Sequence, residues 1–215
     1  MRPRRHGDDD QARLNGYRQT IERYLRYVLI RCTGYTNNKA QVQRIAAYTL
    51  VTACLLFDKL RGPADVGSLV ERMVKIVGED PMGDWRLDMD GDSEPITQRV
   101  FVLNDRMCEV AGTINAVEPL ARQLLILHHV EGLDAEALAD AHGLSVDEIG
   151  KALAEAEGQF LEILRGLSPG DDGTEPNVRV LLVRLAECID RPWAQSLGAF
   201  VLGYAAEWKE SGSMA

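Results

Sequence analysis

The stretch at residues 130–160, VEGLDAEALADAHGLSVDEIGKALAEAEGQF, decides the fold of this 215-residue chain. Its apolar residues recur every three or four positions on each side of a central glycine, which predicts two short helices joined by a turn. Five of them are spaced to close a small core between those helices: Leu133, Leu138, Leu144, Ile149 and Leu153.

The residues between the two helices have the chemistry that a tight turn requires. Gly143 stands where the backbone needs a residue that tolerates positive φ. Ser145 then begins the next helix, and Glu148, three residues on, completes a capping box. The order helix, glycine turn and capped helix predicts a helix-turn-helix.

The second helix of this motif carries the wrong charge for a helix that reads DNA. The face that would enter a groove offers Asp147, Gly150, Lys151, Ala154, Glu155 and Gly158. Over residues 133–166 there are eight acidic and two basic side chains. Because the phosphate backbone attracts Lys and Arg and repels carboxylates, the frame and the charge of the motif disagree.

The rest of the chain also shows helical periodicity, and no alternating strand pattern competes with it. Apolar stripes predict helices over 13–32, 39–60, 66–77, 98–114, 117–131, 134–142 and 146–166. We therefore expect an all-α protein. Its two helical domains are predicted at 13–77 and 98–166, with a C-terminal helical hairpin at 177–209.

Breaks in the apolar pattern set the boundaries between these parts. Residues 1–12 predict a disordered tail, and residues 78–97 combine prolines, glycines and dense acid as an exposed linker. A further break at 168–176 precedes the hairpin, which is apolar enough that we expect it to pack on the body or on a partner.

Charge is unevenly distributed along the chain, whose net charge is −9. Residues 1–62 contain 12 basic and 5 acidic side chains, so this third either faces nucleic acid or an acidic partner, or is merely solvated. No apolar run approaches the length of a membrane span, so no membrane association is expected. Four widely spaced cysteines are interpreted as small buried hydrophobes of a reducing cytoplasm: Cys32, Cys54, Cys108 and Cys188.

No pattern of an enzyme or of a metal site is found. His128 and His129 are adjacent, so on a helix they point about 100° apart and cannot clamp one metal ion together. The acidic run at 88–92 invites a calcium-loop interpretation, but its glycine is misplaced and Arg99 stands at the twelfth position. We expect no catalysis, no metal and no cofactor.

Residues 117–164 resemble region 4 of the extracytoplasmic-function sigma factors of bacteria, members of the sigma-70 family. The matching positions are Glu118-Pro119, Arg122, Leu125, Leu127, Glu131-Gly132-Leu133, Glu136, Leu138-Ala139, Gly143-Leu144-Ser145, Ile149, Leu153 and Ala156. Residues 13–77 resemble the family's region 2 more weakly, through helix lengths and Arg/Tyr-rich character. The hairpin at 177–209 lies outside the family's minimal plan.

Two departures from the family bear on what the resemblance implies. Where the family's recognition helix carries the basic VKSRLxRAR run, this chain has IGKALAEAE at 149–157, with one lysine. The acidic helix surface by which region 2 docks on the polymerase corresponds to QVQRIAAY at 41–48, which has no carboxylate.

The resemblance implies a cytoplasmic transcription initiation regulator that binds RNA polymerase core and, weakly or indirectly, promoter DNA. Candidate DNA-binding residues in region 4 are Arg122, Ser145, Glu148 and Lys151, although Ser145 and Glu148 can serve only as a cap and Arg122 only as a brace. A polymerase- or DNA-facing basic surface is expected from Arg18, Arg23, Arg26, Arg31, Lys39 and Arg44.

The alternative comes from another class of protein. A sigma fold that has lost its basic recognition helix can act as a protein-binding adaptor or sigma mimic with no promoter recognition of its own. Such a chain could bind an anti-sigma factor or another protein through residues 177–209.

Overall fold

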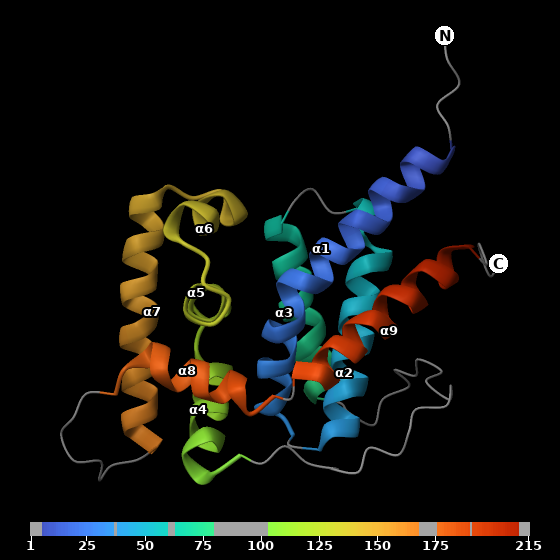
Figure 1. Cartoon of the computed structure of the whole chain (residues 1–215). Coiled ribbons are helices and arrows are strands. Elements are labelled where there is room, and N and C mark those ends of the chain that lie inside the picture. The colour runs from blue at the N-terminus through green and yellow to red at the C-terminus, as the bar shows by residue number, and fades with distance from the viewer. Residues whose placement is uncertain are drawn as a thin grey trace.

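The computed structural model describes residues 6–36, 38–59, 63–79, 103–167, 176–189 and 191–210. In these ranges the chain forms nine α-helices and a short 3₁₀ helix and contains no β-strand, which confirms the all-α class (Figure 1). Their bounds are α1 (His6–Thr33), α2 (Lys39–Leu55), η1 (Phe57–Lys59), α3 (Pro63–Glu79), α4 (Asp105–Ala116), α5 (Pro119–His129), α6 (Ala135–His142), α7 (Val146–Leu167), α8 (Val178–Glu187) and α9 (Arg191–Glu210).

Helices α1, α2 and α3 pack against one another as a three-helix unit. Asn38 begins α2, because its side-chain oxygen accepts hydrogen bonds from the backbone N–H groups of Ala40 and Gln41 at 3.0 and 3.3 Å. The predicted helix over 39–60 is shorter in the structure, since α2 ends at Leu55 and the chain continues in the 3₁₀ turn η1.

The N-terminal part of α1 corrects one prediction. Residues 6–12 were expected in a disordered tail, but α1 begins at His6. Apolar periodicity starts only at Leu14, so it cannot reveal an extension of the helix that precedes the buried stripe. Residues 1–5 lie outside the described residues.

Helices α4 to α7 form the second group; α5, α6 and α7 lie within two residues of their predicted bounds, whereas α4 begins at Asp105 although a helix was predicted from residue 98. Asn104 caps α4 by accepting from Met107 N at 2.9 Å, and Pro119 opens α5 at a position where its missing N–H costs no helical hydrogen bond. The predicted linker at 78–97 lies outside the described residues except for its first two, which belong to α3.

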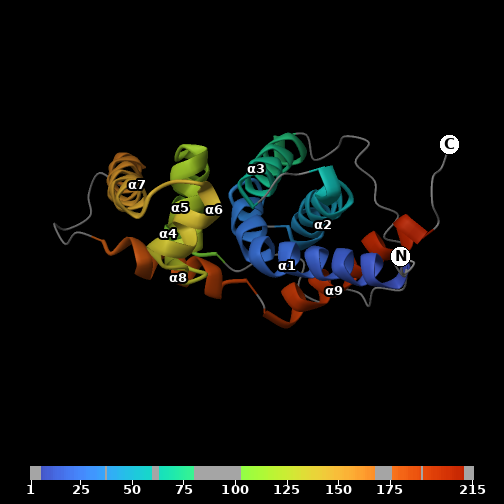
Figure 2. The same ribbon diagram turned by 90° about the horizontal axis from the view of Figure 1, so that it is seen from above.

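The C-terminal helices form, but not as the predicted hairpin. Helix α8 packs mainly on α4 and α5 and also touches α7 and α1, whereas α9 packs on α1 and α2, and the two do not fold back on each other. Figures 1 and 2 show them following one another across one side of the molecule. Each helix has an apolar face to bury: α8 buries its face mainly against α4 and α5, and α9 buries its face against α1 and α2. The expectation that this segment packs on the body is confirmed.

One buried apolar core runs through both groups. It joins Tyr27 and Val28 of α1 to Ile114 of α4, Phe160 of α7 and Val201 of α9. The two-domain division of the chain stays a prediction, but the described helices on either side of it share a core. Among the described residues, no helix is both long enough and apolar enough to cross a bilayer.

Candidate functional site

The turn of the helix-turn-helix has the geometry that its sequence predicts. Gly143 ends α6 in the left-handed region, at φ 67° and ψ 32°, and its N–H bonds to the carbonyl of Ala139. Leu144 N donates to the same carbonyl oxygen at 3.1 Å. A residue with a Cβ is strained at this φ, so the glycine is required for the chain to leave α6 in this direction.

The start of α7 is a reciprocal capping box. Glu148 N donates to Ser145 Oγ at 3.3 Å, and Ser145 N donates to Glu148 Oε2 at 2.8 Å. The Ser145 hydroxyl also donates to this carboxylate at 2.7 Å, and these hydrogen bonds hold the pKa of Glu148 below its usual value. Both side chains lie on the surface, but the contacts that they make within the chain are those of a helix cap.

A small separate core holds the two helices of the motif at a set angle. It buries Leu138 and Ala139 of α6 against Ile149 and Leu153 of α7, with two leucines of α5 behind them. Three of the five leucine and isoleucine positions that predicted this core are buried, and Leu133 and Leu144 pack against it half-exposed.

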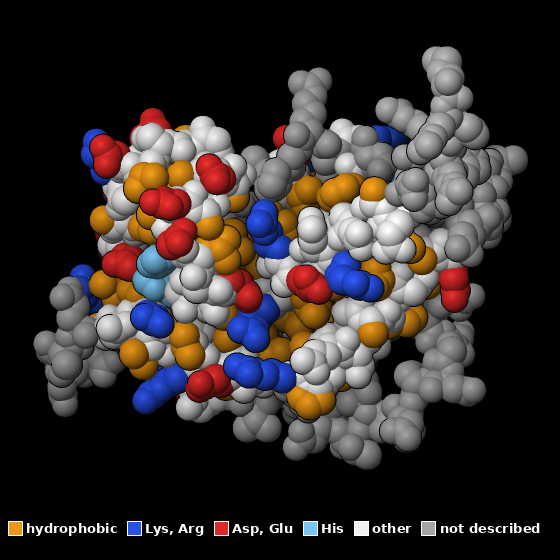
Figure 3. Space-filling model, turned by 45° about the horizontal axis from the view of Figure 1, so that its top comes forward, with side chains coloured by type: hydrophobic (Ala, Val, Ile, Leu, Met, Phe, Trp, Pro, Cys, Tyr) orange, Lys and Arg blue, Asp and Glu red, His pale blue; other side chains and the backbone are white. Residues whose placement is uncertain are grey.

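The exposed face of α7 is acidic. Asp147, Glu148, Lys151 and Glu155 are all exposed, together with the small residues Gly150, Ala154 and Gly158. Figure 3 shows carboxylates gathered over the α6–α7 half of the molecule, at the upper left. Lys151 is the one basic side chain among these four charged residues.

Arg122, expected to bind DNA, lies inside the molecule. It is 6 % exposed, and its guanidinium donates to the Val117 carbonyl oxygen through Nε at 3.2 Å and through Nη2. Its Nη1 lies 3.3 Å from Glu71 Oε2 in α3. The prediction of a DNA contact is wrong for this residue, because its donors are occupied within the chain; the bracing role is the one that the structure shows.

Arg31 meets the same carboxylate from the other side. Its Nη2 lies 3.3 Å from Glu71 Oε2, the residue is 1 % exposed, and its guanidinium lies 5.8 Å from the centre of the Tyr35 ring. Arg31, Glu71 and Arg122, here called the buried charge cluster, thus join α1, α3 and α5. Asn115 adds a hydrogen bond to the Arg31 carbonyl oxygen at 3.2 Å.

Burial dominates the titration of this cluster. It raises the pKa of Glu71 to about 7, an effect that the charge of Arg122 partly opposes, and it lowers the pKa of Arg31. The pKa of Arg122 is lowered by burial and by the charge of Arg31. Two guanidinium groups and one carboxyl group therefore share a poorly solvated space.

Glu71 was not predicted from the sequence as part of any site. The available signal was its place in α3, three residues before the buried Val74 and four after the buried Gly67, on the side that faces the core. A carboxylate on a buried helical stripe indicates a partner, but the partners are 40 and 51 residues away and cannot be identified by spacing.

The expected basic surface is only partly a surface. Arg18, Arg23 and Arg44 are exposed, and Arg26 is half-exposed, 3.7 Å from Glu131. Arg31 and Lys39 are buried, so both are removed from that surface. A one-dimensional charge count cannot show this burial. Of the four cysteines, Cys32 and Cys54 are buried as expected, whereas Cys108 is exposed and Cys188 is half-buried.

The two histidines of α5 take separate structural roles. His128 Nδ1 lies 2.7 Å from the Leu133 carbonyl oxygen and so ties α5 to the loop before α6. His129 Nε2 lies 2.9 Å from Glu157 Oε1 in α7, and burial lowers its pKa although Glu157 opposes the shift. Within the described residues, no group of three His, Cys, Asp or Glu side chains is placed to hold a metal ion.

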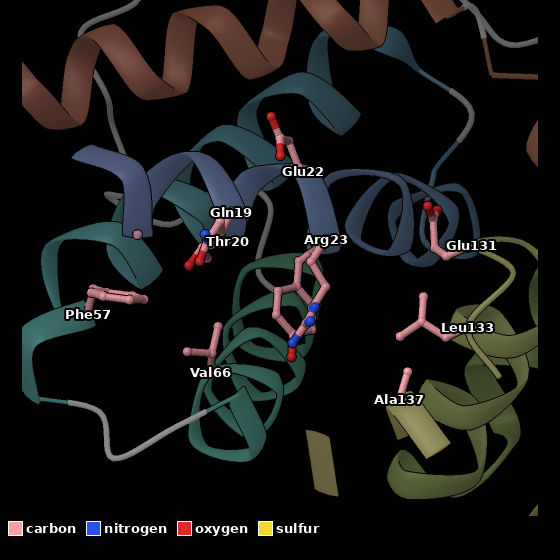
Figure 4. Close-up of a pocket in the computed structure, with 11 residues that line it drawn as sticks. Gln19, Thr20, Glu22, Arg23, Phe57, Val66, Glu131, Leu133 and Ala137 are labelled. Atoms are coloured by element: carbon pink, nitrogen blue, oxygen red, sulfur yellow. The ribbon is translucent and has the colours of Figure 1, made fainter. Parts of the chain in front are cut away.

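A cleft of about 600 Å³ separates α1 and the start of α3 from the loop and helix that open the helix-turn-helix. Figure 4 shows Phe57 and Val66 on one side, Leu133 and Ala137 on the other, and Arg23 between them. This cleft is not evident in the sequence, because its two walls are about 70 residues apart.

No family model, no curated protein sequence and no solved structure matches this chain. The likeness to sigma factors thus depends on the residues of the helix-turn-helix and on the order of the helices.

Proposed function

We infer that this chain is a sigma-like regulator of transcription initiation that binds RNA polymerase core in the cytoplasm and has no covalent chemistry. The observation that carries the proposal is the helix-turn-helix at 134–167, with its left-handed Gly143, its capping box and its own core. Such a frame positions one exposed helix face rigidly toward a partner. The three-helix unit before it has the place in the chain that region 2 has in the family.

The charge of α7 determines how promoter DNA enters this proposal. Its exposed carboxylates repel phosphates. Arg122, which could have added a positive charge nearby, is buried. DNA is therefore met, weakly, through exposed arginines of α1 and α2 that lie outside the cleft lining, namely Arg18 and Arg44, rather than through α7.

The acidic face of α7 also favours a second candidate, a sigma-like adaptor that binds a protein and recognises no promoter. An exposed acidic helix suits a basic protein surface better than a duplex. The apolar residues of α8 and α9 do not support an external partner for 177–209, because Leu182, Leu185 and Val201 are buried within the chain itself.

The experiment that tests the proposal is reconstitution with polymerase. The tagged chain is recovered from its host, the co-purified proteins are identified, and binding is repeated with purified core enzyme on a sizing column. The sigma-like proposal expects the beta and beta-prime subunits in near-stoichiometric amount and a complex with purified core. Recovery of a different protein without polymerase, and separate elution from purified core, would favour the adaptor.

Contact with DNA through α1 and α2 is tested by salt dependence. Fluorescence anisotropy with a labelled duplex is measured for the wild type and for the variant Arg18→Gln with Arg44→Gln, both exposed positions. The variant should bind more weakly and with a smaller salt slope, because two phosphate contacts are lost. The exposed Arg165→Gln with Arg184→Gln is the matched control, and equal losses in both variants would contradict the assignment.

A further inference from the structure

The cleft between the two helix groups has the size and lining of a small-molecule site. Its volume of about 600 Å³ lies within the range of sites for small organic ligands. Its inner surface is formed by Thr20, Tyr24 and Val66, each at most 5 % exposed. The mixture of an apolar lining with a few polar groups is what such sites use to bind and orient a ligand.

One apolar wall of the cleft is held firmly in place. The Phe57 ring lies directly against the backbone of α1 at Gly16, where a Cβ would come within 2.6 Å of the ring. It also meets the Tyr17 ring edge to face, with 6.2 Å between centroids. Leu133 and Ala137 form the opposite wall, and Leu133 is anchored through its carbonyl by His128. The two walls are therefore formed before any ligand arrives.

Arg23 is the one basic side chain among the described residues that line this cleft, which also include the carboxylates of Glu22 and Glu131. Figure 4 shows its side chain pointing into the space between Val66 and Leu133, whereas Glu22, which also lines the cleft, points in a different direction from α1. The carboxylate of Glu131 lies 3.7 Å from Nε of Arg26, which offsets part of its charge. Arg23 itself has no ion-pair partner among the described residues.

His142 lies near enough to Arg23 to be affected by its charge. Burial, and after it the charge of Arg23, lowers the pKa of His142, and the Nε2 of this residue is buried without a hydrogen-bond partner. Figure 3 shows the hollow between the two halves, with hydrophobic side chains inside it and charged side chains around it. An anion placed at Arg23 is attracted there, and an apolar body attached to it reaches the walls.

We propose that this cleft binds a small organic anion, with its carboxylate or phosphate on Arg23 and its apolar body between Phe57 and Leu133. Gln19 and Thr20 of α1 also line the cleft and offer the anion further polar groups. Such a ligand touches α1, α3 and α6 together, so its binding stabilises the arrangement of the helix-turn-helix against α1 by mass action. The inference goes beyond the proposed function and does not depend on it.

The test uses three probes with one apolar body: 2-naphthoate, 2-naphthyl phosphate and the neutral 2-naphthamide. Binding to the full chain is measured by calorimetry and by amide chemical shifts. The two anions should bind more tightly than the amide. Arg23→Gln should weaken the anions by about tenfold, as expected for a charge-assisted pair, and leave the amide unchanged.

Two further variants keep the test decisive. Arg18→Gln makes the same change at an exposed position of the same helix outside the cleft lining, and it should leave all three affinities as in the wild type. Ala137→Trp, at an exposed position of α6, should fill the cleft and weaken all three probes. Circular dichroism melts confirm that each variant is folded.

The proposal is overturned by any of three results. The first is that the anions bind Arg23→Gln and Arg18→Gln with equal affinity. The second is that Ala137→Trp does not weaken binding of the probes. The third is that no probe binds at millimolar concentration, where fragments of this size are expected to bind. None of these measurements involves polymerase or DNA, so failure here leaves the proposed function unaffected.

Discussion

Glu71 illustrates how one side chain couples helices that are distant in the sequence. Its Oε2 atom lies 3.3 Å from a nitrogen of Arg31 and 3.3 Å from a nitrogen of Arg122, while its Oε1 is buried without a hydrogen-bond partner. Burial raises the pKa of this carboxyl from 4.5 to about 7. The folded chain therefore binds a proton here more tightly than the unfolded chain does.

We predict a pH-dependent stability difference between the wild type and Glu71→Gln. Because the folded pKa lies above the unfolded one, the contribution of Glu71 is fully present below pH 4.5 and is lost as the pH rises to about 7. The free energy of unfolding of the wild type, relative to Glu71→Gln, should fall by up to about 3 kcal/mol over this range. Denaturant titrations at several pH values measure it.

The control for this experiment is Glu79→Gln, which removes an exposed carboxylate from the same helix. Its stability should differ from that of the wild type by a few tenths of a kcal/mol at every pH. Parallel pH profiles for the wild type and Glu71→Gln would show that the buried carboxyl keeps an ordinary pKa.

At the scale of single elements, the turn between α6 and α7 depends on one left-handed glycine. We predict that Gly143→Ala lowers the free energy of unfolding by about 1 kcal/mol, because alanine is strained at φ 67°. Gly150→Ala, inside α7, should instead raise it by about 0.5–1 kcal/mol. A Cβ at either position meets no atom within 4 Å, so the two substitutions differ in backbone conformation and not in steric clashes. Equal effects of both substitutions on thermal melts would refute this account.

The charge of α7 can be reversed without touching its core. Ala154 and Glu155 are exposed, and Ala154→Arg with Glu155→Arg should raise affinity for duplex DNA severalfold, with a steeper salt dependence, if this face is sterically free to meet DNA. The control adds the same charge on α8 and α9, as Glu187→Arg with Ala199→Arg. Anisotropy at two salt concentrations compares them. Identical affinities for the two variants would mean that only net charge matters.

At the scale of the whole molecule, the continuous core predicts cooperative unfolding. Leu182 of α8 is fully buried in that core, and Leu182→Ala should cost about 2–5 kcal/mol. The loss of hydrogen-exchange protection should reach α1 as well as α4 and α7, because α8 packs on all three. Mass spectrometry of deuterium uptake measures this. Loss confined to α4–α8, with α1 unchanged, would indicate two units that unfold independently.

The sequence alone was enough to predict the helices and the helix-turn-helix. Their stripes, caps and turn residues act over three or four positions, so Gly143, Ser145 and Glu148 could be assigned from local spacing. It did not reveal that α1 starts at His6, because that extension precedes the first apolar residue of the stripe.

Which charged residues face solvent, and where the cleft lies, depends on how the helices pack in three dimensions. Arg31, Lys39 and Arg122 look like other surface bases in the sequence, but all three are buried in the folded chain. Likewise, the apolar residues of α8 and α9 predicted burial without saying against what, and each helix packs on a different group. The physical reason is the same in each case: helix formation depends on near neighbours, whereas burial depends on contacts between residues tens of positions apart.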